Sequence, residues 1–288
     1  MAGDDKQVAA AAANGPEAAA QAEQQKMMAA TNQMAAVIMR AVQNAQRKLY
    51  EDLDALAARG MAENADKLCD KAGAPPPVHG LVLRVLGDAC MACKDPDAAR
   101  AALTRGAQLN ASAADKKGLH PRLRMDALAR LGDLKAALGE VERADGQEKA
   151  SIRFLRQAAA AFERMGPAGV HFAAAAHNRC AAVLVEQGDF DGALEELDEA
   201  VSFANKSEGS GPQLRAQAGL NRGACLRARG DLTAAYTAWK DAEVHAAEAN
   251  AERIMEELTA AMEEVMADPN FVMPAAEGAT KADESAFL

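Results

Sequence analysis

The sequence predicts an all-α fold, and three observations favour it. Half of the 288 residues are hydrophobic, yet only 3% are aromatic, and alanine dominates the remainder. Alanine is the strongest helix former, and its small side chain lets helices approach closely. The β-branched and aromatic runs and the Asn-Gly turns typical of β-sheets are missing. Apolar residues instead recur at steps of three and four, the period of an amphipathic helix.

Composition and charge exclude several classes of function. The net charge of -10 disfavours partners such as nucleic acids and anionic membrane surfaces. The first residues, MAGDDKQ, carry acids where a targeting peptide would carry bases, and no stretch reaches the apolar length of a membrane span. Five irregularly spaced cysteines are typical of a reducing compartment. We therefore expect a cytoplasmic protein.

The N-terminal region divides into two parts. Residues 1–26 are rich in Ala, Gln and Glu, and we expect them to be disordered. Residues 27–72 are predicted to form a long amphipathic helix, from Met27 to Ala58, and a degenerate helical hairpin. The apolar stripe of the long helix comprises Met34, Ile38, Val42, Ala45, Leu49, Leu53 and Leu56. This stripe is too short, and too rich in Met and Ala, to favour a coiled coil.

Two segments further along the chain match each other around a Gly-Asp turn. The turns are Gly188-Asp189 and Gly230-Asp231, and small and large residues stand at equal offsets from both glycines. The matched pairs are Ala181 with Gly223, Leu184 with Leu226, Ala193 with Ala235, Leu197 with Trp239, and Ala200 with Ala242.

This alternation resembles the tetratricopeptide repeat (TPR), a helix-turn-helix unit with small and large residues at these offsets. The resemblance implies an α-solenoid of TPR-like repeats preceded by the long N-terminal helix. Small residues would sit where the two helix axes come closest, and large ones would fill the space on either side. Glycine would permit the left-handed turn between the helices. Arg229-Gly230-Asp231 is then an interhelical turn rather than an adhesion motif.

Weaker copies of the pattern extend the predicted array over residues 78–248. The best of them, over residues 81–110, turns at Lys94-Asp95 and has Gly87, Cys90, Ala99 and Leu103 at the repeat offsets. Further turns are predicted at Gly60 and at Gly132-Asp133. An additional helix, Glu148 to Met165, would be left unpaired, so we expect the array to bend or split near Gly166-Pro167. Residues 249–266 are predicted to form a capping helix, and residues 267–288 a flexible tail whose Phe271, Val272 and Met273 dock back on the last repeat or on a partner.

No residue pattern indicates catalysis, a cofactor or a metal site. Cys90 and Cys93 form a CxxC near the end of a predicted helix, where the helix dipole opposes a thiolate. The five histidines form no HExxH motif, and His177 falls on a core position. The carboxylates Glu195, Glu196, Asp198 and Glu199 are expected on exposed helix faces. We therefore expect a non-enzymatic protein, with an unrecognised active site in the 146–173 region as the less favoured alternative.

The resemblance also implies where partner proteins bind. First helices of successive repeats line a concave groove suited to an extended peptide or a helix. Transferring the groove offsets gives the candidate binding residues Arg84, Asp88, Met91, Asn178, Ala182, Val185, Leu220, Ala224 and Arg227. A basic segment with Arg215, Arg222, Arg227 and Arg229 follows an acidic one, 189–199, and the two are expected to neutralise each other.

These inferences point to a scaffold or adaptor within a multi-protein assembly, with ciliary or cytoskeletal assemblies as the expected setting. A cochaperone or assembly factor is the alternative. Chaperone-binding members of the family hold a partner's C-terminal carboxylate with lysines, asparagines and an arginine. Asn221 and Arg179 fall on such offsets, but Tyr50, Arg84 and Asn178 stand where lysines are expected, which disfavours this alternative.

Overall fold

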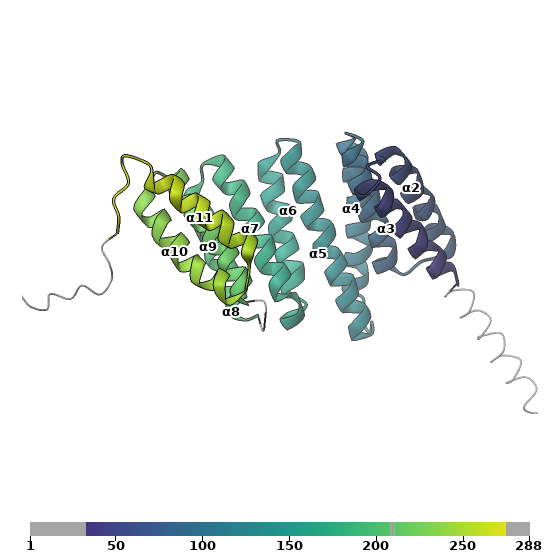
Figure 1. The fold of residues 1–288 in the computed structure, drawn as a ribbon. Helices are drawn as coiled ribbons and strands as arrows, with labels where there is room; N and C mark the ends of the chain where they lie inside the picture. The colour runs from purple at the N-terminus through teal and green to yellow at the C-terminus, as the bar shows by residue number, and fades with distance from the viewer. Residues whose placement is uncertain (1–32, 208, 210, 275–288) are drawn as a thin grey trace, which may run out of the picture. The chain divides into compact units, whose positions relative to one another are not determined.

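The computed structural model describes residues 33–207, 209 and 211–274, and every regular element among them is helical (Figure 1). The predicted all-α fold is therefore confirmed. The low-complexity segment 1–26 and tail residues 275–288 lie outside the described residues. Chain contacts divide the protein after Lys116 into two compact units, each of which is considered separately. None of the described helices is long and apolar enough to cross a bilayer.

Unit 1 contains two helical hairpins. In the first, a helix over 33–50 is followed by α2 (Ala55–Ala72); in the second, α3 (Pro76–Ala92) is followed by α4 (Pro96–Ala114). The α3–α4 hairpin confirms the repeat predicted over residues 81–110. Its predicted core residues Gly87, Cys90, Ala99 and Leu103 are all buried.

The predicted long N-terminal helix ends earlier than expected, because the helix stops at Tyr50 and a new one begins at Ala55. Asp54 caps α2, since its Oδ1 accepts a hydrogen bond of 3.0 Å from the Ala57 N–H. Leu53 adopts a left-handed backbone (φ 54°) in the intervening turn. Ile38, Val42, Ala45 and Leu49 are buried as predicted, but Leu53 and Leu56 are 81% and 77% exposed. The turn predicted at Gly60 is wrong, because Gly60 lies inside α2.

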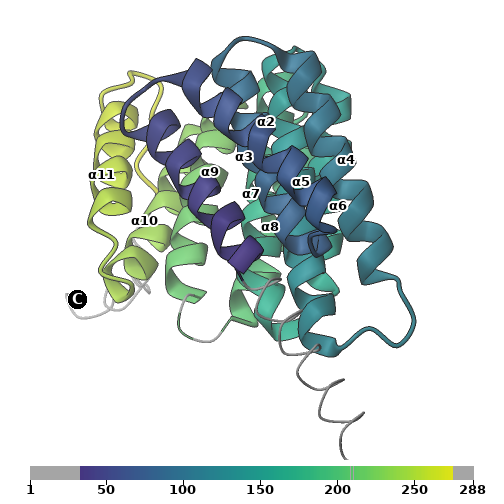
Figure 2. The same ribbon diagram turned by 90° about the vertical axis from the view of Figure 1, so that its right-hand side faces the viewer.

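Unit 2 contains three hairpins and a final single helix (Figures 1 and 2). The helices α5 and α6, α7 and α8, and α9 and α10 pair with each other, and α11 packs on both α9 and α10. Their bounds are α5 Pro121–Ala144, α6 Glu148–Glu163, α7 Val170–Gln187, α8 Phe190–Asn205, α9 Gly211–Ala228, α10 Leu232–Glu248 and α11 Glu252–Met266, with a short 3-10 helix, η1, over Gly166–Gly169.

The turn predicted at Gly132-Asp133 is wrong, because both residues lie within the 24-residue helix α5. The turn between α5 and α6 is at Gly146, which has a positive φ of 70°. The helix predicted over 148–165 is therefore not an unpaired insertion but the second helix of a hairpin. The division of the chain correspondingly lies at Lys116 and not near Gly166-Pro167.

The interhelical turns share one geometry. Lys94, Gly146, Gly188 and Gly230 all have positive φ, and they are separated by 52, 42 and 42 residues. At Gly188 the N–H donates to the Val185 carbonyl and the next N–H donates to the Leu184 carbonyl, each at 3.0 Å. These two hydrogen bonds satisfy two backbone carbonyls at the end of α7. After three of the four turns an aspartate caps the next helix; these are Asp95, Asp189 and Asp231.

Helix pairing depends on a small residue seven positions before each turn. Gly87, Gly139 and Gly223 lie against Leu103, Leu155 and Trp239, the residues nine positions after the turn. Ala181 and Leu197 occupy the same positions around Gly188, and both are 1% exposed. The close approach predicted for Gly223 is confirmed, but its neighbour is the large residue of the second helix and not the small one.

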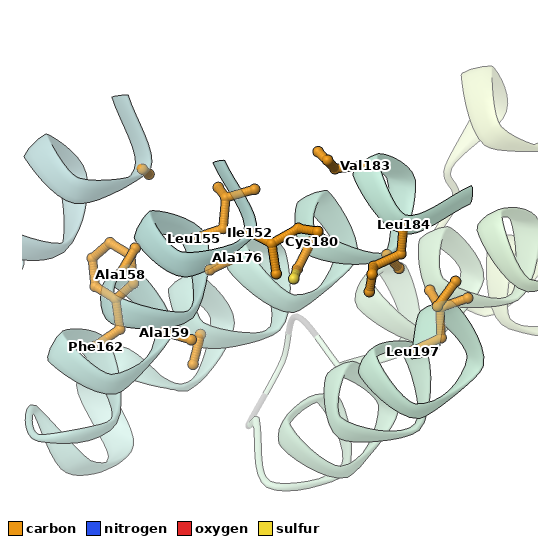
Figure 3. Close-up of a cluster of buried hydrophobic side chains, with 14 of the residues drawn as sticks. Ile152, Leu155, Ala158, Ala159, Phe162, Ala176, Cys180, Val183, Leu184 and Leu197 are labelled. Atoms are coloured by element: carbon orange, nitrogen blue, oxygen red, sulfur yellow. The ribbon is translucent and has the colours of Figure 1, made fainter. Parts of the chain in front are cut away.

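The core of unit 2 follows from this pairing. Between α6, α7 and α8, apolar side chains such as Leu155, Phe162, Cys180 and Leu197 interdigitate (Figure 3). A second cluster around Trp239 and Leu258 joins α9, α10 and α11. The segment after α11 returns to α10, where the Phe271 ring lies 5.3 Å from that of Tyr236 and the Val272 carbonyl accepts a hydrogen bond of 2.9 Å from Thr233 Oγ1. The predicted docking of Phe271 on the last repeat is thus observed.

Candidate functional site

A groove between α7 and α9 lies on the first helices of two successive repeats. It has a volume of about 290 Å³ and is lined by Ala175, Asn178, Arg179 and Ala182 of α7 and by Leu214, Gln217 and Asn221 of α9. A second hollow of about 420 Å³ shares Leu214 and Gln217 with it and adds His171, Gln213 and residues 251–254 at the start of α11. The two hollows form one continuous surface over three helices, which we call the α7–α9 groove.

Side-chain amides connect the two sides of this groove. Asn221 Nδ2 donates to Asn178 Oδ1 at 3.3 Å, and Gln217 Nε2 donates to Asn221 Oδ1 at 3.4 Å. Asn178 is 7% exposed, so this bond fixes its orientation. Each amide offers two N–H donors and a carbonyl with two lone pairs, which is more than these two bonds consume. The amides can therefore also bond to the main chain of an extended peptide.

Arg179 is the charged residue lining the smaller hollow. Its side chain is exposed, and it makes no hydrogen bond or ion pair with any residue that the structure describes. An uncompensated guanidinium beside apolar Ala175, Ala182 and Leu214 favours an acidic group on whatever lies in the groove.

The predicted groove residues of unit 2 are only partly brought together. Asn178 and Ala182 line the α7–α9 groove, whereas Val185 packs against the α6–α7–α8 core. Leu220 is part of the α9–α10–α11 core, and its carbonyl accepts a 3.0 Å hydrogen bond from Trp239 Nε1. Ala224 is exposed and lies outside the lining.

Arg227 contacts the capping helix. Its Nη1 lies 2.7 Å from Glu264 Oε2, and its Nη2 bonds the other carboxylate oxygen. The hydrogen bond from Arg227 holds the pKa of Glu264 below its ordinary value. Arg227 is therefore engaged within the protein, and its role toward a partner stays a prediction.

The candidate residues of unit 1 lie on α3. Arg84 forms an ion pair with Asp88, and the Tyr50 hydroxyl donates to the other Asp88 oxygen at 2.9 Å. Met91 is half-buried. The three polar side chains thus join the first helices of two successive hairpins, and their role in binding a partner stays a prediction.

Glu196 is wrongly predicted as exposed, because it is 7% exposed between α6, α7 and α8. Its carboxylate lies 2.7 Å from both Arg156 Nε and His177 Nδ1. Burial acts to raise the pKa of Glu196, but the hydrogen bonds from His177 and Arg156 outweigh it, so the pKa is lowered. His177 is confirmed as a packing residue, 12% exposed and stacked on Phe203.

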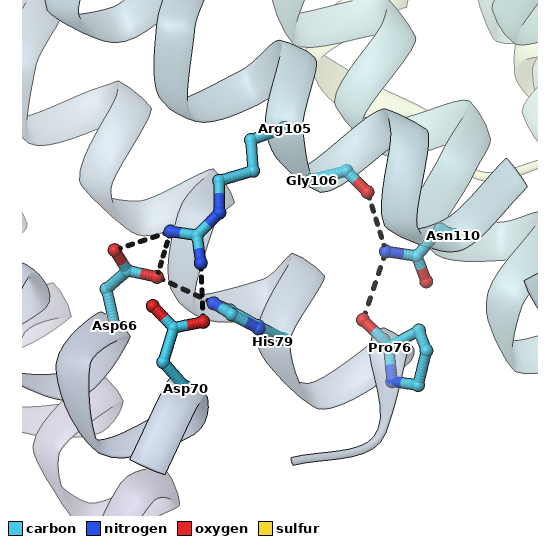
Figure 4. A network of polar contacts seen from close by, with 7 residues as sticks. All are labelled: Asp66, Asp70, Pro76, His79, Arg105, Gly106 and Asn110. Atoms are coloured by element: carbon cyan, nitrogen blue, oxygen red, sulfur yellow. Dashed lines mark hydrogen bonds and ion pairs between the residues drawn. The ribbon is translucent and has the colours of Figure 1, made fainter. Parts of the chain in front are cut away.

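A second polar cluster joins the three helices α2, α3 and α4 (Figure 4). His79 Nε2 lies 2.6 Å from Asp66 Oδ1, and Arg105 bonds Asp66 at 2.9 Å and Asp70 at 2.5 Å. The donor set of two carboxylates and an imidazole is one that metals use. The Arg105 guanidinium already bonds both carboxylates, however, so the cluster is an ion-pair network that joins three helices.

Four of the five cysteines are buried packing residues: Cys69, Cys90, Cys180 and Cys225. Cys90 of the CxxC is buried near the end of α3, and burial raises its pKa. Burial likewise raises the pKa of Cys69 to about 11 and that of Cys180 to about 12. These thiols are therefore protonated at neutral pH and are poor nucleophiles.

The groove contains residues that the sequence analysis did not assign to it. Gln217 and Leu214 stand 13 and 16 positions before Gly230, and Asn221 stands nine before it. The α9 side of the groove is therefore displaced by one residue from the offset that selected Leu220. Arg179 stands at the same offset from Gly188 as Asn221 from Gly230. Comparing the two repeats at this offset would have identified both groove residues.

No protein-family model and no curated protein matches the sequence. Solved structures do match the fold. Two crystal structures of a kinesin light chain-like protein of Podosopora anserina, with nearly identical TPR-like repeats, superpose with TM-scores of 0.56 and 0.55 at 17% and 16% identity. The alignments cover 75% and 81% of this chain and 97% and 99% of those chains. A Rap protein complexed with Competence and Sporulation Factor gives a TM-score of 0.50 at 13% identity, over 85% of this chain and 71% of that one.

At these identities the likeness concerns the fold, and it agrees with the hairpins, left-handed turns and small-to-large packing described above. The chain is accordingly an α-solenoid protein built of TPR-like helical repeats.

Proposed function

We propose that this protein is an interaction scaffold or adaptor, and that its α7–α9 groove holds an extended segment or a helix of a partner protein. The observation that carries the proposal is the amide network of Asn178, Gln217 and Asn221 beside the unpaired Arg179. Arg179, unlike the buried Glu196, makes no hydrogen bond or ion pair with any residue that the structure describes.

The chemistry of the groove favours a peptide as occupant. Side-chain amides can bond alternately to main-chain N–H and C=O groups, which every peptide offers. Ala175, Ala182 and Leu214 leave apolar surface between them for a partner side chain. Partner specificity would then come from the shape of this surface and from the charge of Arg179.

The experiment is an affinity purification from the native organism, read by mass spectrometry, with wild-type protein and an Arg179→Glu/Asn221→Asp variant. Both substitutions are on the groove, and the one hydrogen bond that Asn221→Asp removes, to Asn178, belongs to the proposed binding network. A matched control is Arg40→Glu, which inverts an exposed charge on the helix over 33–50. The proposal predicts partners that bind wild type and the control but are depleted about tenfold or more with the groove variant, while circular dichroism is unchanged. Equal recovery of every partner by all three proteins would refute it.

Two of the binding residues predicted from the sequence have structural roles within unit 2. Arg227→Glu would break the bond to Glu264 and so would perturb α11 as well as any partner. Leu220 contributes to the core. Neither residue gives a clean test of binding, which is why Arg179 and Asn221 are chosen.

The proposed setting is a larger assembly in the cytoplasm, of cytoskeletal or ciliary type. The support for this setting is the fold shared with the kinesin light chain-like structures. A cochaperone role is less well supported, because Tyr50, Arg84 and Asn178 stand where lysines would hold a C-terminal carboxylate. Deleting the last residues of a captured partner distinguishes the two: a cochaperone would lose its partner, whereas an internal peptide would still bind.

A further inference from the structure

A different groove arises where one repeat lacks the large side chains of its neighbours. The relevant positions are 11 residues before and eight residues after each turn residue. They hold Lys135 and Phe154 around Gly146, and the Lys135 ammonium lies 5.1 Å from the centre of the Phe154 ring. Around Gly188 the same positions hold His177 and Glu196, joined at 2.7 Å.

Around Gly230 these positions hold Gly219 and Ala238. Two of the smallest residues thus replace the large side chains. Gly219 packs tightly on Ala242, where an added Cβ would stand 2.6 Å from the Ala242 Cβ, and beside this contact a pocket lies between α8, α9 and α10. The resulting pocket has a volume of about 570 Å³, within the range of small-molecule sites. We call it the α8–α10 pocket, and it uses a different face of α9 from the α7–α9 groove. Its apolar lining consists of Leu197, Val201, Ala218, Gly219, Leu226, Ala234, Ala238 and Ala242.

The rim of the α8–α10 pocket is predominantly basic. Arg215, Arg222 and His245 line it, against the single carboxylate of Asp241 and the neutral Thr237. These three side chains border the same apolar surface, and such a combination can recognise an anionic head attached to an apolar body.

The arginines do have carboxylate partners, but these lie outside the pocket lining. Arg222 Nη1 is 2.6 Å from Asp198, and Arg215 Nη2 is 3.7 Å from Glu248. The Asp198 and Glu248 side chains are 64% and 50% exposed. Ion pairs of such exposure are weak because water screens them, so a bound anion can share or replace them at little cost.

We propose that the α8–α10 pocket binds a small hydrophobic organic anion, a carboxylate or sulfonate with an aliphatic or aromatic body. The body lies on Ala238, Ala242 and Leu226, and the head lies between Arg215 and Arg222. A free small molecule is favoured over a partner helix because the pocket is bounded by helices on three sides and its size matches a ligand. This proposal is independent of the peptide groove.

The test uses anilinonaphthalene sulfonate, whose fluorescence rises in an apolar site, with the full-length protein. We expect saturable binding at one site and displacement by octanoate but not by octanol at the same concentration. Ala238→Phe introduces the residue present at the equivalent position 154, and it should weaken binding about tenfold by filling the pocket. Arg222→Gln should weaken it about threefold to tenfold.

Two further variants distinguish a specific loss of dye binding from a general loss of folding. Asp241→Asn removes the one carboxylate of the lining, so it should strengthen binding about threefold, an effect that a loss of the pocket cannot give. Asn221→Asp, in the peptide groove, should bind the dye like wild type. Circular dichroism and melting temperature are compared for all variants. The proposal is overturned if Ala238→Phe folds and binds the dye unchanged, if Asp241→Asn does not bind more tightly, or if octanol displaces the dye as well as octanoate does.

Discussion

Replacing Gly223 by alanine should destabilise unit 2, because the new methyl group has no space. A Cβ atom at position 223 would stand 2.1 Å from Trp239 Nε1. A normal contact between such atoms is about 3.5–4.0 Å, so the ring or the helix has to move by more than 1 Å. Trp239 is 1% exposed, and its N–H donates to the Leu220 carbonyl at 3.0 Å. The indole therefore cannot move aside without losing this bond.

The expected cost follows from three opposing contributions. Overpacking a core costs about 1–3 kcal/mol, and leaving a buried N–H unpaired costs about 1–3 kcal/mol. The better helix propensity of alanine returns about 1 kcal/mol. The net loss in the free energy of unfolding should be about 3 kcal/mol for Gly223→Ala.

A double variant tests the cause. Gly223→Ala/Trp239→Leu recreates the Ala181 and Leu197 pair that is fully buried one repeat earlier. Each single change should be destabilising, but the double variant should be more stable than their sum by about 2 kcal/mol, since leucine vacates the space that the methyl group needs.

The assay is urea unfolding followed by circular dichroism at 222 nm, which does not rely on the tryptophan. Gly60→Ala is the matched control, because no atom lies within 4 Å of a Cβ at that helical position. It should be neutral or stabilising by up to about 1 kcal/mol. The reasoning is refuted if Gly223→Ala behaves like Gly60→Ala, or if the effects of the two core changes add to within about 0.5 kcal/mol.

Three further predictions concern side chains that join helices. Glu196→Gln should destabilise unit 2 by about 1–3 kcal/mol at pH 7, because it removes the charge that Arg156 and His177 share. The lowered pKa of Glu196 means that this stabilisation is present above the ordinary carboxyl range and is lost as pH falls through the folded-state value. The urea midpoints of variant and wild type should therefore converge as the pH falls below the ordinary carboxyl range, and a constant difference would contradict this. Arg105→Gln should lower the melting temperature by leaving Asp66 and Asp70 as unneutralised neighbours, and Asp66→Asn should partly restore it. Phe271→Ala should increase proteolysis after α11 without changing helicity, whereas Val272→Ala, whose contact with Thr233 is through the backbone, should not.

Much of the repeat architecture could be predicted because the residues that form each turn and its helix cap are neighbours in the sequence. A Gly-Asp pair supplies both a left-handed residue and a helix cap, and at Gly188 and Gly230 the flanking small and large residues agree with it. The core positions of Ala181, Leu197 and Trp239 followed directly. The predicted pairing of the acidic and basic segments is confirmed for Arg222 with Asp198 and for Arg229 with Asp191. It is wrong for Arg215 and Arg227, which pair with Glu248 and Glu264 instead.

The Gly-Asp pair gave a wrong prediction in the α5–α6 hairpin, where the pair and the actual turn lie at different positions. Gly132-Asp133 carries the sequence of a turn but lies within α5, where Gly132 instead makes room for the Phe162 ring and Asp133 pairs with Arg130. The true turn, at Gly146, is followed by Gln147, which makes no side-chain cap. Glycine for close packing and glycine for a turn look alike in a single sequence, and only the partner helix distinguishes them.

The candidate site was harder to predict, because it depends on helix rotation. One residue is 100° of rotation about a helix axis, so a shift by one position took Leu220 into the core and left Asn221 on the groove. Glu196 was misassigned for a related reason: its partners, Arg156 and His177, come from two other helices. The sequence around Glu196 therefore does not indicate that its carboxylate is buried.

The lone helix α11 has a consequence for how the molecule behaves in a crowded solution. Its inner face, with Ile254, Leu258, Met262 and Val265, is buried against the last hairpin, while Glu252, Glu256, Glu257 and Glu263 face solvent. An unsealed repeat end would present an apolar surface on which further copies could stack. The exposed carboxylates of α11 instead cover this side of the last hairpin with a charged, hydrated surface, which disfavours stacking of an apolar helix face on it.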